Sequence, residues 1–542
     1  MNSSAGKNFL KGAAILGIAG LIVKVIGAFY RIPLTNILTP VGMAYYGTAY
    51  PVYSLLLVIS SAGLPTAISK LVAERHILGD RQGAYNVFRV AYRFLAVMGL
   101  AITLLMALGA GVIANAAERP DAALSIMAIA PSILFVCLIS AYRGYFQGHQ
   151  NMMPTAASQL IEQIGKVVLG LFVFIPIMLP GGLNYGSAGA LLGVTGSELA
   201  ALVLLMGMHA RGKRGLRAEG IDFRVRITES KKIIRALLVV GVPITIGASI
   251  MPLVQFIDTA IVSNVLRNVL GYSQEVTDEM FGLLSGNVNS LVNMPAVISL
   301  ALAMGLVPAI AAHVAKRNMH GVSATSSIGL KLTILIGLPC AVGLAVLAEP
   351  ILKLLYGGLN ANQLSLASSL LEVMAVGVLF LSIVQGMTGV LQGQGKVFLP
   401  VVALLIGAIV KVFFSAMLIR QPEYNIMGAP IGTVACYAFA ACLDIVFAIH
   451  YCKLKFNILN LVIKPVLASG FMGLAAHFSY GIISAAIRSN TIATLAAIAI
   501  AILVYALFLI VLGAIRPEDM EFLPGGGKLE KLMYRFGIWK RV

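Results

Sequence analysis

One apolar stretch, residues 12–38, contains two cations, and this combination limits what the chain can fold into. About twenty apolar residues form a helix that crosses the ~30 Å hydrocarbon core of a bilayer. Lys24 lies near the middle of the stretch and Arg31 follows seven residues later, so both lie on one helix face, about 10 Å apart. Gly20 and Gly27 share that face and leave room for a large group.

Two interpretations of these cations follow, because a charge at membrane depth is costly unless it faces a cavity or a partner. In the first, both face a cavity and bind an anionic substrate. In the second, Lys24 pairs with an acid on another helix and Arg31 extends past Pro33 toward the membrane surface. No acid lies within one helical turn of either residue. The sequence therefore favours the cavity.

The composition indicates a membrane protein with many spans, since 59% of the 542 residues are hydrophobic and only 11% are charged. The formal net charge is +18, but the cations lie in short loops between apolar segments, which is typical of orientation signals and not of nucleic-acid binding. The 5 cysteines lack CxxC spacing, so we expect neither a disulfide framework nor a metal site. The first apolar segment is longer than a signal-peptide core, and we expect it to be retained.

Breaks at Gly, Pro and charged clusters give about fourteen spans and predict an all-α polytopic membrane protein. With a cytoplasmic N-terminus, the inner loops hold most cations, so the positive-inside rule places both termini in the cytoplasm. The basic segment 211–235 and the basic tail 516–542 are expected to lie on the anionic inner leaflet, the tail as an amphipathic helix. The predicted outer loops contain only Arg119, Arg267, Lys353, Arg420 and Arg488.

The chain also repeats itself. AGLPTAISKLVAER at residues 62–75 aligns with MGLVPAIAAHVAKR at residues 304–317, an offset of 242, and the identities continue to Gly79 and Gly321. Two further matches follow at offsets of 245 and 239. They pair Gly144/Gly389, Gln147/Gln392, Gly148/Gly393 and Lys166/Lys411, and then Tyr185/Tyr424, Gly189/Gly428, Ala190/Ala429 and Gly193/Gly432.

A repeat of six spans predicts two lobes that enter the membrane in the same direction, related by a pseudo-twofold axis along the membrane normal, with a cavity between them. We therefore expect an N-lobe at residues 1–210 and a C-lobe at 236–455, joined by the basic linker. Two extra C-terminal spans at 456–515 have no partner in the repeat.

At two of these segments the chain resembles a known family. AGLPTAISKLVAE at residues 62–74 and RGYFQGHQNMMPTAASQLIEQIGK at residues 143–166 are similar to stage V sporulation protein B and the polysaccharide-biosynthesis proteins of Gram-positive bacteria. That family belongs to the MOP superfamily, beside the MurJ-type lipid II flippases and the MATE drug antiporters. The resemblance covers essentially the whole chain.

The resemblance implies a flippase of the bacterial cell membrane that works by alternating access. Its cargo would be an undecaprenyl-pyrophosphate-linked cell-wall precursor, and cell-wall synthesis proteins would be further partners. In MurJ-like proteins a cationic N-lobe cavity takes the diphosphate. Lys24 and Arg31 match the basic positions of the first helix there, and Asp258 matches an acidic position that some relatives use for sodium. Span eleven here has Lys411 and no acid, so the sodium site is incomplete.

Two further cations are candidates for substrate binding. A diphosphate requires two or more fixed cations in a site of low dielectric constant. Lys166 is the weaker candidate, because Glu162 lies one turn before it and is expected to neutralise it. Lys411 either reaches the cavity or pairs with Asp258, Glu372 or Asp444. The sequence assigns no role to Glu198.

Pro243 and Pro252 lie inside the seventh span and remove backbone donors, so that helix is expected to be bent or broken, as a hinge or merely as a kink. We find no catalytic motif and predict no enzyme activity and no cofactor. A coupling ion (Na⁺ or H⁺) or the membrane potential would drive transport. The alternatives are a MATE-like cation-coupled multidrug antiporter, which needs an acidic cavity, and a membrane glycosyltransferase or ligase, which needs a larger external loop with acids and a histidine.

Overall fold

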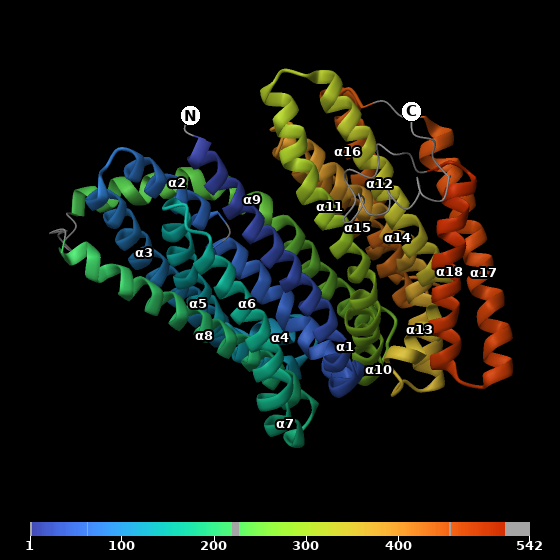
Figure 1. Cartoon of the computed structure of the whole chain (residues 1–542). Coiled ribbons are helices and arrows are strands. Elements are labelled where there is room, and N and C mark those ends of the chain that lie inside the picture. The colour runs from blue at the N-terminus through green and yellow to red at the C-terminus, as the bar shows by residue number, and fades with distance from the viewer. Residues whose placement is uncertain (1–2, 62, 219–226, 455–456, 515–542) are drawn as a thin grey trace. The chain divides into compact units, whose positions relative to one another are not determined.

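The computed structural model describes residues 3–61, 63–218, 227–454 and 457–514, and every element in these ranges is a helix (Figure 1). This confirms the predicted all-α class. The chain divides into two compact units, Met1–Gly286 and Asn287–Val542. Residues 219–226 of the predicted linker and the whole of the predicted amphipathic tail lie outside the described residues.

The first unit is built around a long first helix, α1 (Ser3–Ser61). It packs against α5, α6, α8, α9 and α10. The other elements of this unit are α2 (Leu64–Ile77), α3 (Arg81–Leu108), α4 (Ala110–Ala116), η1 (Pro120–Ala122), α5 (Ala123–Gly148), α6 (Met153–Val167), η2 (Val168–Phe174), α7 (Ile175–Met178), η3 (Leu179–Gly181), α8 (Leu183–Ala218), α9 (Ile227–Asn264), η4 (Val265–Val269) and α10 (Gln274–Gly282).

Helix α1 is two helices joined at a kink. Its 59 residues would be about 88 Å long if straight, nearly three times the ~30 Å that one crossing needs. Thr39 breaks the helix with φ 60° and ψ 174°, directly before Pro40. A positive φ is strained for a β-branched residue. The two expected spans around residues 23 and 58 therefore lie in one element, on either side of Thr39.

Helices α9 and α10 belong to the first compact unit, although the repeat assigns their residues to the predicted C-lobe. Asn86 of α3 donates to Glu229 near the start of α9, and the Gly63 amide donates to Thr245 Oγ1 farther along α9, at 3.2 Å each. On α10, a Cβ at Gly282 would lie 1.7 Å from the Pro40 carbonyl oxygen, so only glycine permits this approach of the two backbones. The lobe boundaries derived from the repeat stay a prediction.

The second unit follows η5 (Leu283–Val288), and α14 is its central helix. Helix α14 packs against α11, α12, α15 and α16. The predicted extra spans form the pair α17 and α18, and Tyr505 of α18 donates a 2.8 Å hydrogen bond to the Leu335 carbonyl of α12. The elements of this unit are α11 (Asn289–Ala315), α12 (Met319–Val346), α13 (Ala348–Leu355), α14 (Ala361–Gly393), α15 (Phe398–Ile419), η6 (Asn425–Met427), α16 (Gly428–Cys452), η7 (Leu459–Ile463), α17 (Lys464–Ile487) and α18 (Asn490–Val511).

The element boundaries follow the sequence repeat. Helices α3 and α12 are each 28 residues long, and α5 and α14 end at the matched glycines Gly148 and Gly393. Each of these glycines lets its helix approach a neighbour closely, α5 on α2 and α14 on α11. The two halves therefore reuse one packing scheme.

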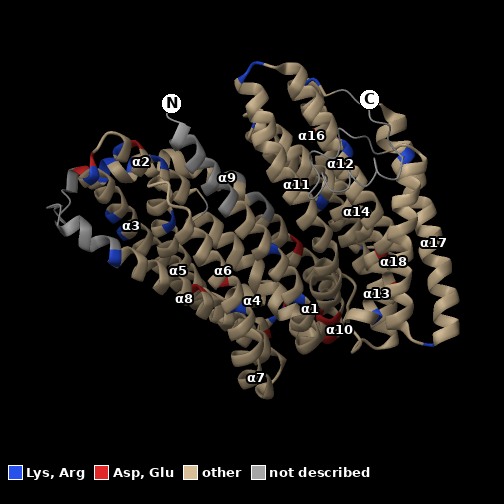
Figure 2. Cartoon of the chain, viewed as in Figure 1, with Lys and Arg blue, Asp and Glu red and all other residues tan. Residues whose placement is uncertain are grey.

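Twelve helices in the described part of the chain are long and apolar enough to cross a membrane. One of these twelve runs from Leu16 to Ile77 and so contains both expected spans of α1. The predicted number of about fourteen is not confirmed. Figure 2 shows that charged residues gather mainly at helix ends and in loops, while the helices are largely free of them apart from a few positions.

Candidate functional site

Three of the four predicted substrate-binding cations lie in the first unit, two of them on α1. Lys24 is exposed, and no carboxylate forms an ion pair with it in the described part of the chain. A Cβ at Gly20 would meet open space, whereas a Cβ at Gly27 would lie 3.0 Å from Gln163 Nε2 of α6. This helix face is therefore open at Gly20 and packs on α6 about two turns later, at Gly27.

Arg31 is half-buried and makes two contacts. Its Nη1 donates to the Ser285 carbonyl oxygen at 3.2 Å, and its guanidinium lies 5.5 Å from the centre of the Tyr46 ring. The first contact joins the end of the first span to η5, and the second is a cation–π interaction. Neither contact neutralises the charge, so the guanidinium keeps donors for an anion.

Lys166 lies beside the same group of tyrosines. Its Nζ lies 5.0 Å from the centre of the Tyr30 ring and 5.5 Å from that of Tyr50. The Tyr50 ring stacks on the Tyr46 ring, with 5.6 Å between the ring centres, and the centre of the Tyr53 ring lies 5.8 Å from that of Tyr50. Residues 46, 50 and 53 share one face of α1. We call Tyr46, Tyr50 and Tyr53 the tyrosine row; it brings Arg31 and Lys166 together.

Glu162 forms its ion pair with Arg143 and not with Lys166. Arg143 Nη2 lies 2.8 Å from Glu162 Oε1, and Arg143 Nε donates to Ser158 Oγ at 2.9 Å. The expectation that Glu162 neutralises Lys166 from one helical turn away is therefore wrong. A cation on α5 competes for the carboxylate, and sequence spacing within α6 could not reveal it. Lys166 becomes a stronger candidate than the sequence suggested.

An acid, Glu198 of α8, contacts the tyrosine row and is 6% exposed. Its Oε1 accepts a 2.6 Å hydrogen bond from the Tyr53 hydroxyl, at the end of the tyrosine row. Its Oε2 is buried and has no hydrogen-bond partner among the described residues. Sequence analysis left this residue without a role. The i, i+4, i+7 spacing of the tyrosines was the readable signal for the site, and it was missed.

The remaining candidates lie elsewhere. Lys411 is buried in α15 of the second unit and is 6% exposed, whereas Arg31 and Lys166 lie in the first unit. Asp258 is half-buried in α9 of the first unit. Both make polar interactions of their own. Of the acids proposed as partners for Lys411, Glu372 is exposed, and Asp444 is fully buried with both carboxylate oxygens lacking a hydrogen bond in the described structure.

Helix α9 runs unbroken from Ile227 to Asn264, through both Pro243 and Pro252. The backbone is therefore not broken at these prolines, and the expected bend stays a prediction. A hinge role for either proline stays a prediction, as do the binding roles of the four cations and the coupling role of Asp258.

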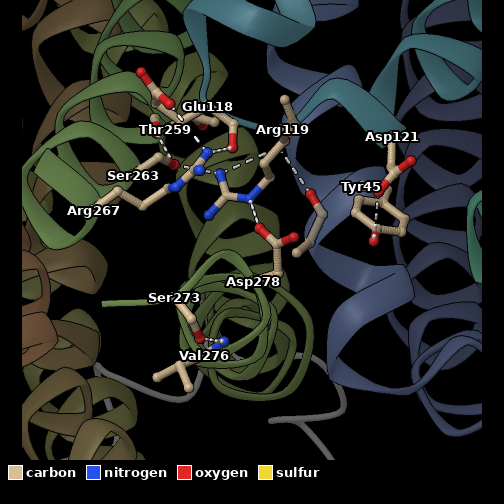
Figure 3. Close-up of polar contacts among 12 residues, drawn as sticks. Tyr45, Glu118, Arg119, Asp121, Thr259, Ser263, Arg267, Ser273, Val276 and Asp278 are labelled. Atoms are coloured by element: carbon tan, nitrogen blue, oxygen red, sulfur yellow. Dashed lines mark hydrogen bonds and ion pairs between the residues drawn. The ribbon is translucent and has the colours of Figure 1, made fainter. Parts of the chain in front are cut away.

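A second polar cluster joins the segment before α5 to α9 and α10 (Figure 3). Arg119 Nε donates to Asp278 Oδ1 at 2.6 Å, and its Nη1 donates to Ser263 Oγ. Beside this pair, Arg267 Nη1 donates to both the carbonyl oxygen and the carboxylate of Glu118, at 2.8 and 3.0 Å. Sequence analysis treated Arg119 and Arg267 only as loop charges, because their partners lie about 150 residues away or more.

The two sites suggest different chemistry. At the tyrosine row, two cations held by aromatic rings in a buried setting can bind an anion by charge-assisted hydrogen bonds, because few water molecules screen them. In the Arg119 cluster each cation is paired with a carboxylate, although Arg119 Nη2 has no hydrogen-bond partner in the described part of the chain, and the cluster is suited to holding helices together. No group of three or more metal-ligating side chains occurs in the described ranges.

The twelve long apolar helices in the described part of the chain indicate a multi-span membrane protein. A family model described as polysaccharide biosynthesis protein matches residues 9–314, and the MatE model matches residues 285–417. The first match covers more than half of the chain, so the chain belongs to the polysaccharide biosynthesis protein family. This confirms the resemblance found in the sequence.

Two curated relatives match most or nearly all of the chain. Stage V sporulation protein B of Bacillus subtilis (strain 168) is 29% identical over 530 residues, which are 97% of this chain and 99% of that protein. Lipid II flippase MurJ of the same organism is 26% identical over 444 residues, covering 79% of this chain and 80% of that protein.

Solved structures show the same fold. A lipid II flippase MurJ in an inward closed conformation covers 92% of this chain and 98% of its own, with a TM-score of 0.69 and 16% identity. The match to an inward-facing multidrug resistance MATE family transporter of the MOP superfamily covers 82% of this chain and 98% of that one, with a TM-score of 0.66 and 16% identity. The chain thus has the fold of the flippases and transporters of that superfamily.

Proposed function

We propose that this protein is a flippase that moves an undecaprenyl-pyrophosphate-linked cell-wall precursor from the inner to the outer leaflet by alternating access. The single observation that carries the proposal is the pair Arg31 and Lys166 on the tyrosine row. Neither cation forms an ion pair with a carboxylate in the described part of the chain. Two such groups provide donors for the oxygens of a pyrophosphate.

The relatives support a cargo of this kind. A lipid II flippase and a stage V sporulation protein are similar to this chain over most of its length. In our proposal the sugar-bearing pyrophosphate binds at the tyrosine row, the lipid tail stays in the bilayer, and both termini lie in the cytoplasm, as the cation bias indicates. Asp258 is kept as the candidate for an ion-coupling residue.

The second candidate function is a MATE-like exporter of organic cations. The MatE family match over residues 285–417 favours it. An organic cation needs carboxylates or open aromatic faces in its binding site. The tyrosine row instead carries Arg31 and Lys166, which would repel it, and its acid Glu198 has one oxygen occupied by Tyr53. This sign of charge favours an anionic cargo.

The test is transport by the purified protein in liposomes. A fluorescent undecaprenyl-pyrophosphate-linked sugar is placed in the inner leaflet, and its arrival outside is followed with an impermeant quencher. We expect flipping by the wild type and its loss in Lys166→Ala. Lys70→Ala is the matched control, because Lys70 is exposed and pairs with Glu74 within α2 at 4.0 Å. Export of an organic cation dye without lipid flipping would support the antiporter instead.

A further inference from the structure

The described structure buries Glu198 beside two cations without pairing it with either. The Tyr53 hydroxyl donates to Oε1, while Oε2 has no hydrogen-bond partner in the described part of the chain. The Lys166 ammonium and the Glu198 carboxylate are near enough to attract each other, whereas Arg31 is near enough to repel the Lys166 ammonium. No salt bridge links Glu198 to either cation among the residues that the structure describes.

All helices packed around Glu198 contribute to this setting. Helix α5 places Cys137 and Ser132 near the carboxyl, and the Ser132 hydroxyl shares a 2.9 Å hydrogen bond with Thr195. Helix α6 contributes Lys166 and also Glu162, whose charge is already balanced by Arg143. The titratable or charged groups that face this region are Tyr30, Arg31, Tyr50, Tyr53, Cys137, Arg143, Glu162 and Lys166.

The charge of this region must change when an anion binds. In the empty site, an ionised Glu198 offsets part of the charge of Lys166 and Arg31, which are half-buried and pair with no carboxylate in the described part of the chain. A bound pyrophosphate supplies negative charge to the same cations. The carboxylate then repels the ligand, and a proton on its unpartnered oxygen removes that repulsion.

We propose that Glu198 is a proton-exchanging counter-ion of the Arg31–Lys166 site. Above the pH range in which it titrates, Glu198 is ionised while the site is empty, and it takes up one proton from water on Oε2 when a phosphate-bearing anion binds. Tyr53 remains the donor to Oε1 in both states. No other bond forms or breaks, and the proton returns to water when the anion leaves. This inference rests on the proposed function, because it takes the headgroup of the lipid-linked cargo as the anion.

The proposal predicts a pH-dependent affinity for the anion. If one proton is taken up for each anion, the affinity falls by up to about tenfold for each unit of rising pH within the range where Glu198 titrates. Undecaprenyl pyrophosphate is the probe, and its binding to the full-length protein in lipid nanodiscs is measured at several pH values. Titration of the probe itself adds the same background to every variant.

Glu198→Gln should remove this slope and leave tight binding at high pH. Asp444→Asn is the matched control, because Asp444 is an equally buried carboxyl in the second unit; it should keep the wild-type slope. Tyr53→Phe removes the donor that stabilises the ionised carboxylate, so it should move the fall in affinity to higher pH. A wild-type slope in Glu198→Gln would overturn the proposal. If that variant does not fold, an unmoved midpoint in Tyr53→Phe overturns it.

A second measurement separates this inference from the proposed function. Infrared difference spectra of the empty protein follow the C=O stretch of protonated carboxyls as the pH is lowered. One titrating carboxyl should be absent from Glu198→Gln and present in Asp444→Asn. If no variant binds the lipid probe at any pH, the proposed cargo is wrong, and this spectrum alone decides whether Glu198 exchanges protons. Identical spectra for wild type and Glu198→Gln would then reject that role.

Discussion

Arg119 and Asp278 form a buried ion pair between parts of the chain that are 159 positions apart. The two atoms, Arg119 Nε and Asp278 Oδ1, lie 2.6 Å apart, and the side chains are 0% and 2% exposed. The guanidinium also lies 4.2 Å from the centre of the Phe281 ring. The predicted N-lobe contains Arg119 and the predicted C-lobe contains α10, so this pair links residues of the two predicted lobes within one compact unit.

Removing one partner of this pair should destabilise the protein strongly. Asp278→Ala leaves a buried guanidinium without a counter-ion, and we expect a loss of about 3–5 kcal/mol in the free energy of unfolding. The double variant Arg119→Met/Asp278→Leu buries no charge, so it should be more stable than Asp278→Ala alone. Thermal unfolding of the purified proteins in detergent measures both effects.

The neighbouring pair provides the control for this prediction. Arg267 and Glu118 are 27% and 30% exposed, so Glu118→Ala should cost only about 0–1 kcal/mol. Equal effects of Glu118→Ala and Asp278→Ala would show that burial does not set the strength of these pairs. A double variant as unstable as Asp278→Ala would show that the cost comes from lost packing and not from an unpaired charge.

Sequence periodicity predicted the helices because each span is a local pattern. It placed Lys24 and Arg31 on one helix and found a repeat whose glycines mark close helix contacts. It failed where partners come from distant helices, as in Arg143 with Glu162, Tyr53 with Glu198 and Arg119 with Asp278.

One register of the repeat also differs between sequence and structure. The sequence alignment of the repeat matches Gly79 with Gly321. In the structure, however, the residue with the same role as Gly321 in capping the next helix is Gly83. The Gly83 amide donates to Asp80 at 2.7 Å, and the Gly321 amide donates to Asn318 at 2.9 Å. The two capping side chains have the same geometry, so a shift in the connecting turn separates them from the sequence alignment.

These two caps should respond differently to acid. The hydrogen bond from Arg75 Nη1, at 2.6 Å, lowers the pKa of Asp80, and the Gly83 amide lowers it further. A carboxyl with a lowered pKa stabilises the folded state above its unfolded pKa of about 3.9, and this contribution is lost as the pH falls through the folded pKa. The Asn318 cap has no charge to lose.

We therefore expect the first turn of α3 to lose protection from hydrogen exchange as the pH falls below about 4, after correction for the intrinsic exchange rate. The first turn of α12 should show no such change. In Asp80→Asn, the protection of the first turn of α3 from hydrogen exchange should no longer change as the pH falls. A loss of protection in both helices at the same pH would point to global acid unfolding instead of this cap.

Transport should depend on the membrane potential, because the cargo carries negative charge outward. One elementary charge moved through 100 mV corresponds to about 2.3 kcal/mol, so an inside-negative potential assists export of the anion. In liposomes, an ionophore that collapses the potential while the pH gradient is kept should slow flipping. Unchanged flipping would exclude the potential as a driving force and leave a coupling ion, with Asp258 as the residue to substitute next.

The two cations of the first span should both be required in cells. We expect Lys24→Ala and Arg31→Ala to lose complementation of a flippase-depleted bacterium while the protein still accumulates in the membrane. Substitution by Glu should be worse, because it repels phosphate as well as removing a contact. Lys24→Arg should keep partial function, since the charge remains while the donor geometry changes.

Arg31 also donates a hydrogen bond to the Ser285 carbonyl oxygen, so Arg31→Lys, which keeps the charge, separates the loss of charge from the loss of that contact. Lys70→Ala, an exposed cation on α2, should complement fully. A structural role predicts low protein levels instead, restored by exchanging charges with an acid on a neighbouring helix. If both alanine variants are abundant and complement fully, neither cation binds the cargo.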